Sequence, residues 1–126
     1  MATVVVVTYM SGPHDGETVR LTASGSPPAI TFGRLDSCTI QIEDDPDVSR
    51  THAKMYWNTG RWWLQDLGSL NGTYLGEFLQ SVKASTPLAV APGQIFRIGT
   101  TRLRLEEAGS AVTEDRREAQ AAELDQ

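Results

Sequence analysis

Turn-forming residues interrupt this chain at short, regular intervals, and that spacing limits the possible folds more than any other feature of the sequence. Glycine, proline and aspartate cluster at residues 11–16, 25–28 and 44–47, and comparable breaks recur roughly every 8–12 residues. Between the breaks, apolar and polar residues alternate with the period of two that a half-buried strand shows. These intervals are too short for the crossover helices of a parallel α/β sheet. The pattern therefore predicts an all-β sandwich or barrel.

The expected strands are short, and several of them indicate which side chains share a face. Ile40 and Ile42 alternate toward one face, whereas the neighbours Trp62 and Trp63 must face opposite sides of their strand. At least one of these two tryptophans therefore belongs to the core. The pair Asn71-Gly72 is a two-residue hairpin signal. The expected strands span residues 4–9, 18–21, 30–32, 39–42, 53–57, 61–67, 73–75, 88–90, 95–98 and 101–105.

The acidic residues responsible for the net charge lie at the C-terminal end of the chain. Residues 106–126 hold seven acids and two bases, which gives 2 − 7 = −5, the net charge of the whole chain. Residues 1–105 are therefore neutral overall. A neutral body lacks the basic surface that general nucleic-acid binding requires, so we expect no nucleic-acid partner.

The composition also changes at this point and divides the chain in two. Aromatic residues disappear after residue 106, and residues with high helix propensity dominate, with Thr113 available as an N-cap. The apolar face of such a helix is too thin to dock firmly. We expect one domain over residues 1–106, followed over 107–126 by an acidic tail that is either a frayed helix or disordered.

The cysteine content and the apolar runs predict the compartment. Cys38 is the one cysteine, so no internal disulfide can form, and a lone thiol fits a reducing compartment. We interpret it as a buried small hydrophobe rather than a nucleophile. The N-terminus lacks the basic leader of a secretory signal, and no apolar run approaches the ~20 residues of a membrane helix. We therefore expect a cytoplasmic protein without a membrane partner.

Three polar clusters follow or precede expected strands, which places them in loops at the rim of a sandwich. They are Gly33-Arg34, residues 49–52 and residues 66–73. Arg34 and Arg50 supply permanent cations with planar donor groups. Serine and asparagine side chains add neutral donors, and the glycines let the backbone approach a ligand closely. This inventory suits a dianionic tetrahedral group such as a side-chain phosphate.

The order of these clusters resembles the forkhead-associated (FHA) domain family, a family of phosphomotif readers. The resemblance spans roughly residues 4–105. It implies an eleven-stranded β-sandwich of two mainly antiparallel sheets, with loops at one end that bind an extended phosphothreonine peptide. The motifs that carry the resemblance are Gly33-Arg34, Ser49-Arg50-x-His52, Asp66-Leu67-x-Ser69-x-Asn71-Gly72-Thr73, Leu88, Pro92-Gly93 and Ile98-Gly99.

The resemblance also implies a role for each matching residue. His52 would brace the binding loops without touching the ligand, and Asn71 would hydrogen-bond the peptide backbone. Ser69 suits a loop cap better than a direct phosphate contact. The implied groups are Arg34, Ser49 and Arg50 for phosphate binding, Asn71, Ser69 and Leu70 for peptide binding, and Gly33, His52, Gly72 and Thr73 for structural support of the site.

The sequence departs from some relatives in two places. Leu70 stands where some members carry a threonine that contributes to the phosphate pocket, so only its backbone could help there. Residues 76–87 lack the Asn-Gly pair that is common after this strand, which leaves any peptide preference set by that loop open.

We do not expect an enzyme, and two classes of binding protein remain. No nucleophile–base set occurs at a plausible spacing, and two histidines with one cysteine make no metal set, so we expect no catalytic residue, cofactor or metal. We interpret Asp44, Asp45 and Asp47 as a solvated turn. The leading hypothesis is a phosphothreonine-dependent interaction module in signalling, with a serine/threonine kinase or its substrate as partner. The alternative is a phospho-independent scaffold that uses the same fold.

Overall fold

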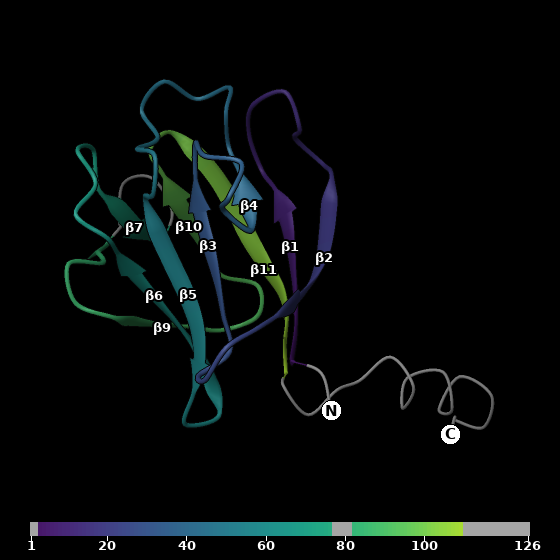
Figure 1. Cartoon of the computed structure of the whole chain (residues 1–126). Coiled ribbons are helices and arrows are strands. Elements are labelled where there is room, and N and C mark those ends of the chain that lie inside the picture. Colours follow the sequence, from purple (N-terminus) through teal and green to yellow (C-terminus); the bar gives the residue numbers. More distant parts are fainter. Residues whose placement is uncertain (1–2, 77–81, 110–126) are drawn as a thin grey trace.

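The computed structural model describes residues 3–76 and 82–109, which form two β-sheets packed face to face (Figure 1). The strands are β1 (Thr3–Tyr9), β2 (Thr18–Ala23), β3 (Ala29–Gly33), β4 (Ile40–Gln41), β5 (Ala53–Asn58), β6 (Arg61–Asp66), β7 (Thr73–Leu75), β8 (Val82–Lys83), β9 (Leu88–Val90), β10 (Ile95–Ile98) and β11 (Thr101–Gly109). The six-stranded sheet has the order β2-β1-β11-β10-β7-β8, and the five-stranded sheet has the order β4-β3-β5-β6-β9. No helix in these ranges is long and apolar enough to cross a membrane.

The predicted fold class is confirmed. β3 and β4 pair in parallel, with Phe32 opposite Ile40, while the other strand pairs are antiparallel. The core lies between the sheets, where Phe32 of β3 meets Phe96 of β10 edge-on, with ring centroids 5.6 Å apart. Trp62 is fully buried and Trp63 is half-buried, as the alternation along β6 requires.

The hairpin predicted at Asn71-Gly72 is wrong, because the strands on either side of it belong to different sheets. β6 lies in the five-stranded sheet and β7 in the six-stranded sheet, so residues 67–72 form a crossing loop. Gly72 still adopts a left-handed backbone, with φ of 85°. Two-residue hairpin turns lie instead at Gly99-Thr100, between the paired Ile98 and Thr101, and at Thr59-Gly60 between β5 and β6. In the latter, φ is 53° and 79° and Asn58 pairs with Arg61.

Two further differences concern strand number and strand length. β8 was not among the expected strands; it pairs with β7, with Tyr74 opposite Lys83. β11 continues to Gly109, so the expected boundary at residue 106 falls inside this strand. The rest of the expected tail, including Thr113 and its helix, lies outside the described residues.

Asp45 corrects the interpretation of residues 44–47 as a solvated turn. Its side chain is buried and accepts hydrogen bonds from the backbone of Asp47 and Thr100 and from the hydroxyls of Thr100 and Thr101. Burial alone would raise the pKa of Asp45, but these hydrogen bonds outweigh it and hold the pKa below its ordinary value of 3.8. Asp45 thereby ties the β4–β5 loop to the β10–β11 turn.

Candidate functional site

The first part of the site is the end of β3, where the chain passes very close to the β4–β5 loop. The backbone N–H of Arg34 donates to the carbonyl of Ser49 at 3.1 Å, and that of Leu35 donates to the carbonyl of Arg50 at 3.2 Å. Gly33 allows this approach, because a Cβ at that position would lie 2.2 Å from the carbonyl oxygen of Arg50. Glycine is required here by space, while its φ lies outside the left-handed region.

The ring of His52 joins the β4–β5 loop to the β6–β7 loop from the interior of the protein. Its ring is fully buried; Nδ1 accepts the backbone N–H of Ser49 at 2.9 Å, and Nε2 lies 2.8 Å from the carbonyl oxygen of Gly72. A carbonyl can only accept, so these partners assign the neutral Nε2–H tautomer. One rigid ring therefore fixes the distance between the loops that carry Ser49 and Gly72.

Asp66, at the end of β6, organises the β6–β7 loop. Its carboxylate accepts the backbone N–H groups of Gly68 and Ser69, both at 2.9 Å, and the hydroxyls of Ser69 and Thr73. Burial alone would raise its pKa, but these hydrogen bonds outweigh burial and hold the pKa of Asp66 below 3.8. Sequence reasoning gives Asp66 no role of its own in the site, although an aspartate two residues ahead of Gly68-Ser69 is a recognisable turn signal.

The two loops also contact each other directly through side chains. The hydroxyl of Ser49 accepts the backbone N–H of Leu70 at 3.1 Å, and Nδ2 of Asn71 donates to the carbonyl of Asp47 at 3.0 Å. A serine hydroxyl has one donor and two acceptor positions, so the proton of Ser49 remains available to a ligand. Asn71 is exposed and keeps its second amide hydrogen and its carbonyl oxygen for further contacts.

The hydroxyl groups of Ser69 and Thr73 are both hydrogen-bonded to Asp66 within the protein. The hydroxyl of Ser69 donates to Asp66 and accepts the backbone N–H of Gly72 at 2.9 Å. Thr73 is fully buried and donates to Asp66 at 2.7 Å. These two side chains hold the loop in shape and offer no spare proton to a ligand.

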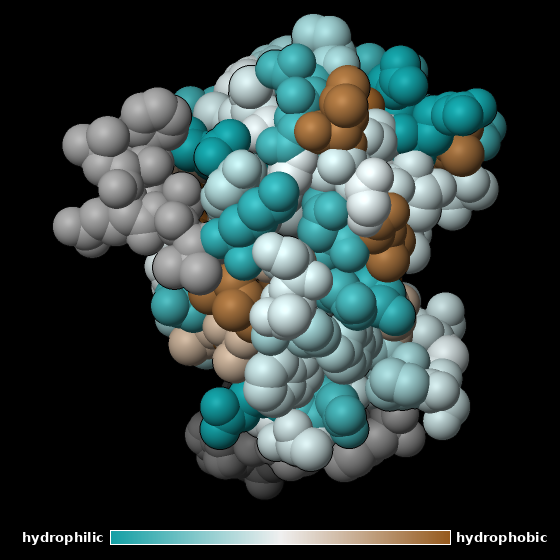
Figure 2. All heavy atoms as spheres, turned by 90° about the vertical axis from the view of Figure 1, so that its left-hand side faces the viewer, coloured by the Kyte–Doolittle hydropathy of each residue, from teal (hydrophilic) through white to brown (hydrophobic). Residues whose placement is uncertain are grey.

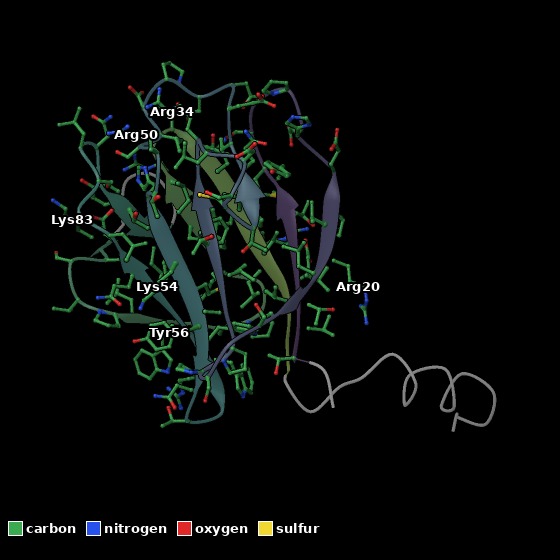
Figure 3. The ribbon with its side chains drawn as sticks, viewed as in Figure 1. Arg20, Arg34, Arg50, Lys54, Tyr56 and Lys83 are labelled. Carbon is green, nitrogen blue, oxygen red and sulfur yellow. The ribbon has the colours of Figure 1, made fainter. Side chains whose placement is uncertain are left out.

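Arg34 and Arg50 supply the positive charge of the site. Both side chains are exposed and lie near each other at the upper end of the sandwich in Figure 3. Among the residues that the structure describes, neither guanidinium has an ion pair or hydrogen bond. A hollow of about 440 Å³ lies beside Arg50 and is lined by Leu35, Ser49, Arg50 and Thr51. Two unpaired guanidinium groups beside a free hydroxyl proton can bind a dianion, since charge-assisted bonds to phosphate are strong.

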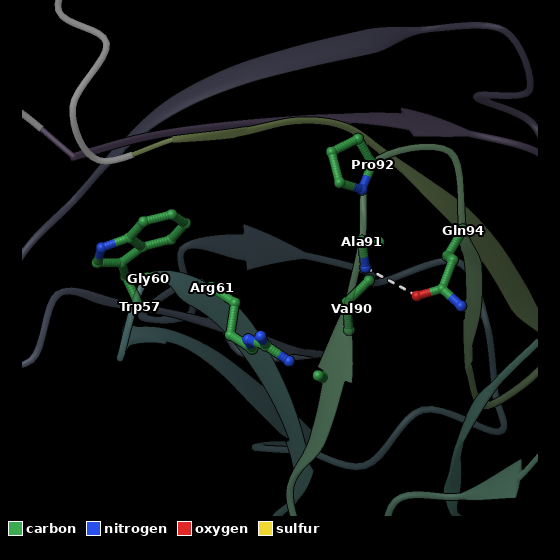
Figure 4. A pocket seen from close by; sticks show the side chains of 8 residues that line it. Trp57, Gly60, Arg61, Val90, Ala91, Pro92 and Gln94 are labelled. Atoms are coloured by element: carbon green, nitrogen blue, oxygen red, sulfur yellow. Dashed lines mark hydrogen bonds between the residues drawn. The ribbon is translucent and has the colours of Figure 1, made fainter.

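A second hollow, of about 420 Å³ (Figure 4), lies beside the β5–β6 hairpin, at the end of the sandwich away from the β4–β5 loop (Figure 1). It is formed by the β5–β6 hairpin and the residues after β9, among them Trp57, Arg61, Pro92 and Gln94. Gln94 is occupied, because its side-chain oxygen accepts the backbone N–H of Ala91 at 2.7 Å. One arginine faces this hollow without a hydroxyl or histidine partner, so the polar chemistry is concentrated at the other end.

Comparison with known proteins gives a consistent result. The sequence model of the FHA domain matches residues 30–99. FHA domain-containing protein FhaB of Mycobacterium tuberculosis (strain CDC 1551 / Oshkosh) is 37% identical over 86 residues, which cover 68% of this chain and 51% of that protein. The chain thus spans about half the length of this curated relative.

Solved structures show the same architecture. The solution structure of the FHA domain of an Arabidopsis thaliana hypothetical protein superposes with a TM-score of 0.70 at 23% identity, covering 88% of this chain and 91% of that one. An FHA domain solved in a study of phosphothreonine-dependent FHA domain interactions gives a TM-score of 0.64 at 24% identity, covering 85% of this chain and 99% of that one.

Proposed function

This chain belongs to the FHA domain family, and from that premise we propose that it is a phosphothreonine-dependent protein interaction module. The observation that carries the proposal is the convergence of Arg34, Ser49 and Arg50 on one end of the sandwich, with unpaired guanidinium groups and a free hydroxyl proton. The relative solved in a study of phosphothreonine-dependent interactions supports the choice of ligand.

Each residue then has a distinct task in binding. Arg34 and Arg50 contact the phosphate oxygens through their planar donor groups, and Ser49 donates its hydroxyl proton to a third oxygen. Asn71 uses its remaining amide hydrogen and carbonyl oxygen on the backbone of the extended peptide. His52 and Asp66 hold the loops in place before the ligand arrives, which lowers the ordering cost of binding.

We further propose that the chain performs no catalysis and acts by recruiting a phosphorylated partner, such as a serine/threonine kinase or a kinase substrate. Both ring nitrogens of His52 are occupied, so it is not placed to act as a general base. Cys38 is buried, and its thiol donates to the carbonyl of Arg50. The residues described by the structure contain no group of three or more His, Cys, Asp or Glu that could hold a metal ion.

The test is a calorimetric titration with a peptide chosen from a library that has a fixed phosphothreonine and degenerate flanks. We expect the unmodified peptide to bind far more weakly, and Arg34→Ala to cost about 2–5 kcal/mol of binding free energy, because a desolvated charge pair loses one partner. Arg61→Ala is the matched control, since this exposed arginine lies at the opposite end. Added salt should weaken binding.

Two outcomes would contradict the proposal. Equal affinity for the phosphorylated and unmodified peptides would favour the phospho-independent scaffold. Equal loss of affinity in Arg34→Ala and Arg61→Ala would show that the candidate site is not where the peptide binds.

A further inference from the structure

The large exposed hydrophobic side chains of the described residues all lie on the loops of the candidate site. They are Leu35, with 41% of its surface exposed, Leu67, with 37%, and Leu70, with 88%. Figure 2 shows hydrophobic patches at the upper end of the molecule, the end at which these loops lie in Figure 1, as well as others at mid-height. Single exposed leucines are common, but a group confined to one end with the free arginines indicates a binding surface.

Two of these leucines are fixed directly beside the groups that hold the anion. The backbone N–H of Leu70 donates to the hydroxyl oxygen of Ser49, so its side chain begins next to the phosphate donor. The backbone N–H of Leu35 donates to the carbonyl of Arg50, and its side chain lines the hollow with Ser49 and Arg50. Leu67 differs, because its backbone is bound to His52 instead.

A ligand that satisfies this surface needs an anionic group and an apolar group close together. Successive residues of an extended peptide advance about 3.3 Å, and alternate residues face the same side. A side chain within a few positions of a phosphothreonine held by Ser49 therefore reaches the neighbouring leucines. A partner with only charged flanks would leave Leu70 in water and would bury no apolar surface on it.

We propose that this chain selects phosphothreonine peptides that carry an aliphatic residue within a few positions of the phosphothreonine, and that Leu70 and Leu35 recognise that residue. The inference rests on the proposed function, because the phosphate contacts position the peptide. Leu70 occupies the position at which some relatives have a threonine, and here the side chain contributes apolar contact area instead of a hydrogen bond.

The test compares two sets of phosphothreonine peptides. One has alanine at every flanking position, and each member of the other has a single leucine at one flanking position. We expect at least one leucine position to improve affinity on the order of tenfold, as for burial of one aliphatic side chain. Leu70→Ala and Leu35→Ala should reduce that gain to about twofold or less, measured for each variant as the ratio of its affinities for the leucine-flanked and the alanine-flanked peptide.

Leu67→Ala is the matched control, since its exposure is similar to that of Leu35 but its backbone is bound to His52. It should keep the leucine preference. Phosphopeptide binding without any aliphatic preference, or a preference that survives both leucine substitutions, would overturn this inference and leave the proposed function intact. If the wild-type protein bound none of the phosphopeptides, both this inference and the proposed function would be overturned. A concentration-dependent dimer abolished by Leu70→Ala would assign the leucines to a second copy of the chain and also refute the inference.

Discussion

Gly33 is the residue through which β3 contacts the rest of the site, and its lack of a side chain is a packing requirement. A Cβ there would lie 2.2 Å from the carbonyl oxygen of Arg50 and 2.7 Å from the sulfur of Cys38. Neither neighbour is free to move, because the Arg50 carbonyl accepts from Leu35 and from the Cys38 thiol. The sequence indicated a glycine that lets the backbone approach a ligand, whereas the structure shows one that lets two loops approach each other.

Replacing Gly33 should therefore damage stability and binding together. We expect Gly33→Ala to lower the free energy of unfolding in urea by about 1–3 kcal/mol through overpacking. It should also weaken phosphopeptide binding at least tenfold, because the segment that carries Ser49 and Arg50 must shift.

Gly12→Ala provides the stability control for this prediction. Gly12 lies in the β1–β2 loop with φ of 80°, and a Cβ there would meet no atom within 4 Å. Alanine at this position should lower the free energy of unfolding by about 1–2 kcal/mol, because a residue with a Cβ is strained in the left-handed conformation. Peptide affinity should be unchanged. If Gly33→Ala lost stability and kept full affinity, the loop contact would not be part of the binding site.

At the scale of elements, the β5–β6 hairpin has the turn geometry that the sequence assigned to Asn71-Gly72. Thr59 and Gly60 both have positive φ, the signature of a type I′ turn. A β-branched residue is strained in that conformation. The hydroxyl of Thr59 donates to the carbonyl of Asn58 at 2.6 Å, which offsets part of the cost.

Thr59→Asn should accordingly stabilise the protein. Asparagine tolerates the left-handed region, and Asn-Gly is the preferred type I′ pair, so we expect a gain of about 0.5–1 kcal/mol in urea unfolding. Thr59→Ser, which keeps the hydroxyl and removes the branch, should give a smaller gain. Peptide affinity should not change, because this hairpin lies at the end away from Arg34. An unchanged or lower stability of Thr59→Asn would contradict the assignment of strain to this turn.

The strands could be predicted from the sequence better than the connections between them. Alternation correctly placed Ile40 and Ile42 on one face, which is buried, and correctly required at least one of Trp62 and Trp63 in the core, but it did not show that Trp62 is the buried one. It could not show that β6 and β7 belong to different sheets, since that depends on long-range pairing rather than on local turn propensity. β8 was missed because two residues show no periodicity.

The site residues illustrate the same limit. The types and order of Arg34, Ser49 and Arg50 indicated an anion site, and the family resemblance carried their roles. What the sequence did not reveal is how each hydroxyl is used. The resemblance favoured Ser69 as a loop cap and Ser49 as a phosphate donor, and the hydrogen bonds supply the partners: the proton of Ser69 is bound to Asp66, whereas the hydroxyl of Ser49 accepts from Leu70 and keeps its proton.

For the whole molecule, two buried or half-buried carboxylates, those of Asp45 and Asp66, hold the loops at the binding end in place. Asp45 joins the β4–β5 loop to the β10–β11 turn, and Asp66 shapes the β6–β7 loop. Among the residues that the structure describes, neither carboxylate forms a salt bridge with a lysine or arginine, and the neutral ring of His52 lies 3.9 Å from Asp66. Both carboxylates instead accept hydrogen bonds from uncharged N–H and O–H groups, and these bonds stabilise the ionised form of each acid.

This arrangement predicts an acid-sensitive fold. Because the pKa of Asp45 and that of Asp66 lie below the ordinary value of 3.8 in the folded state, folding favours the ionised forms. Their stabilisation is fully present above about pH 4 and is lost as the pH falls through the folded-state pKa values. Urea unfolding at a series of pH values should show a fall in stability over that acidic range. The double variant Asp45→Asn, Asp66→Asn should be less stable at neutral pH, and its stability should fall less steeply in acid.

His14 serves as the control for this experiment because its contribution has the opposite sign. Its side chain is exposed, and the hydrogen bond that it donates to the carboxylate of Glu17, together with the nearby charge of Asp44, raises its pKa above 6.5. Any stabilisation by its charged form is present below about pH 6.5 and disappears as the pH rises. His14→Gln should therefore leave the acid limb of the profile unchanged. If the double aspartate variant kept the full acid dependence of the wild type, other carboxylates would control acid unfolding, and the two loops would not depend on Asp45 and Asp66 as the hydrogen bonds indicate.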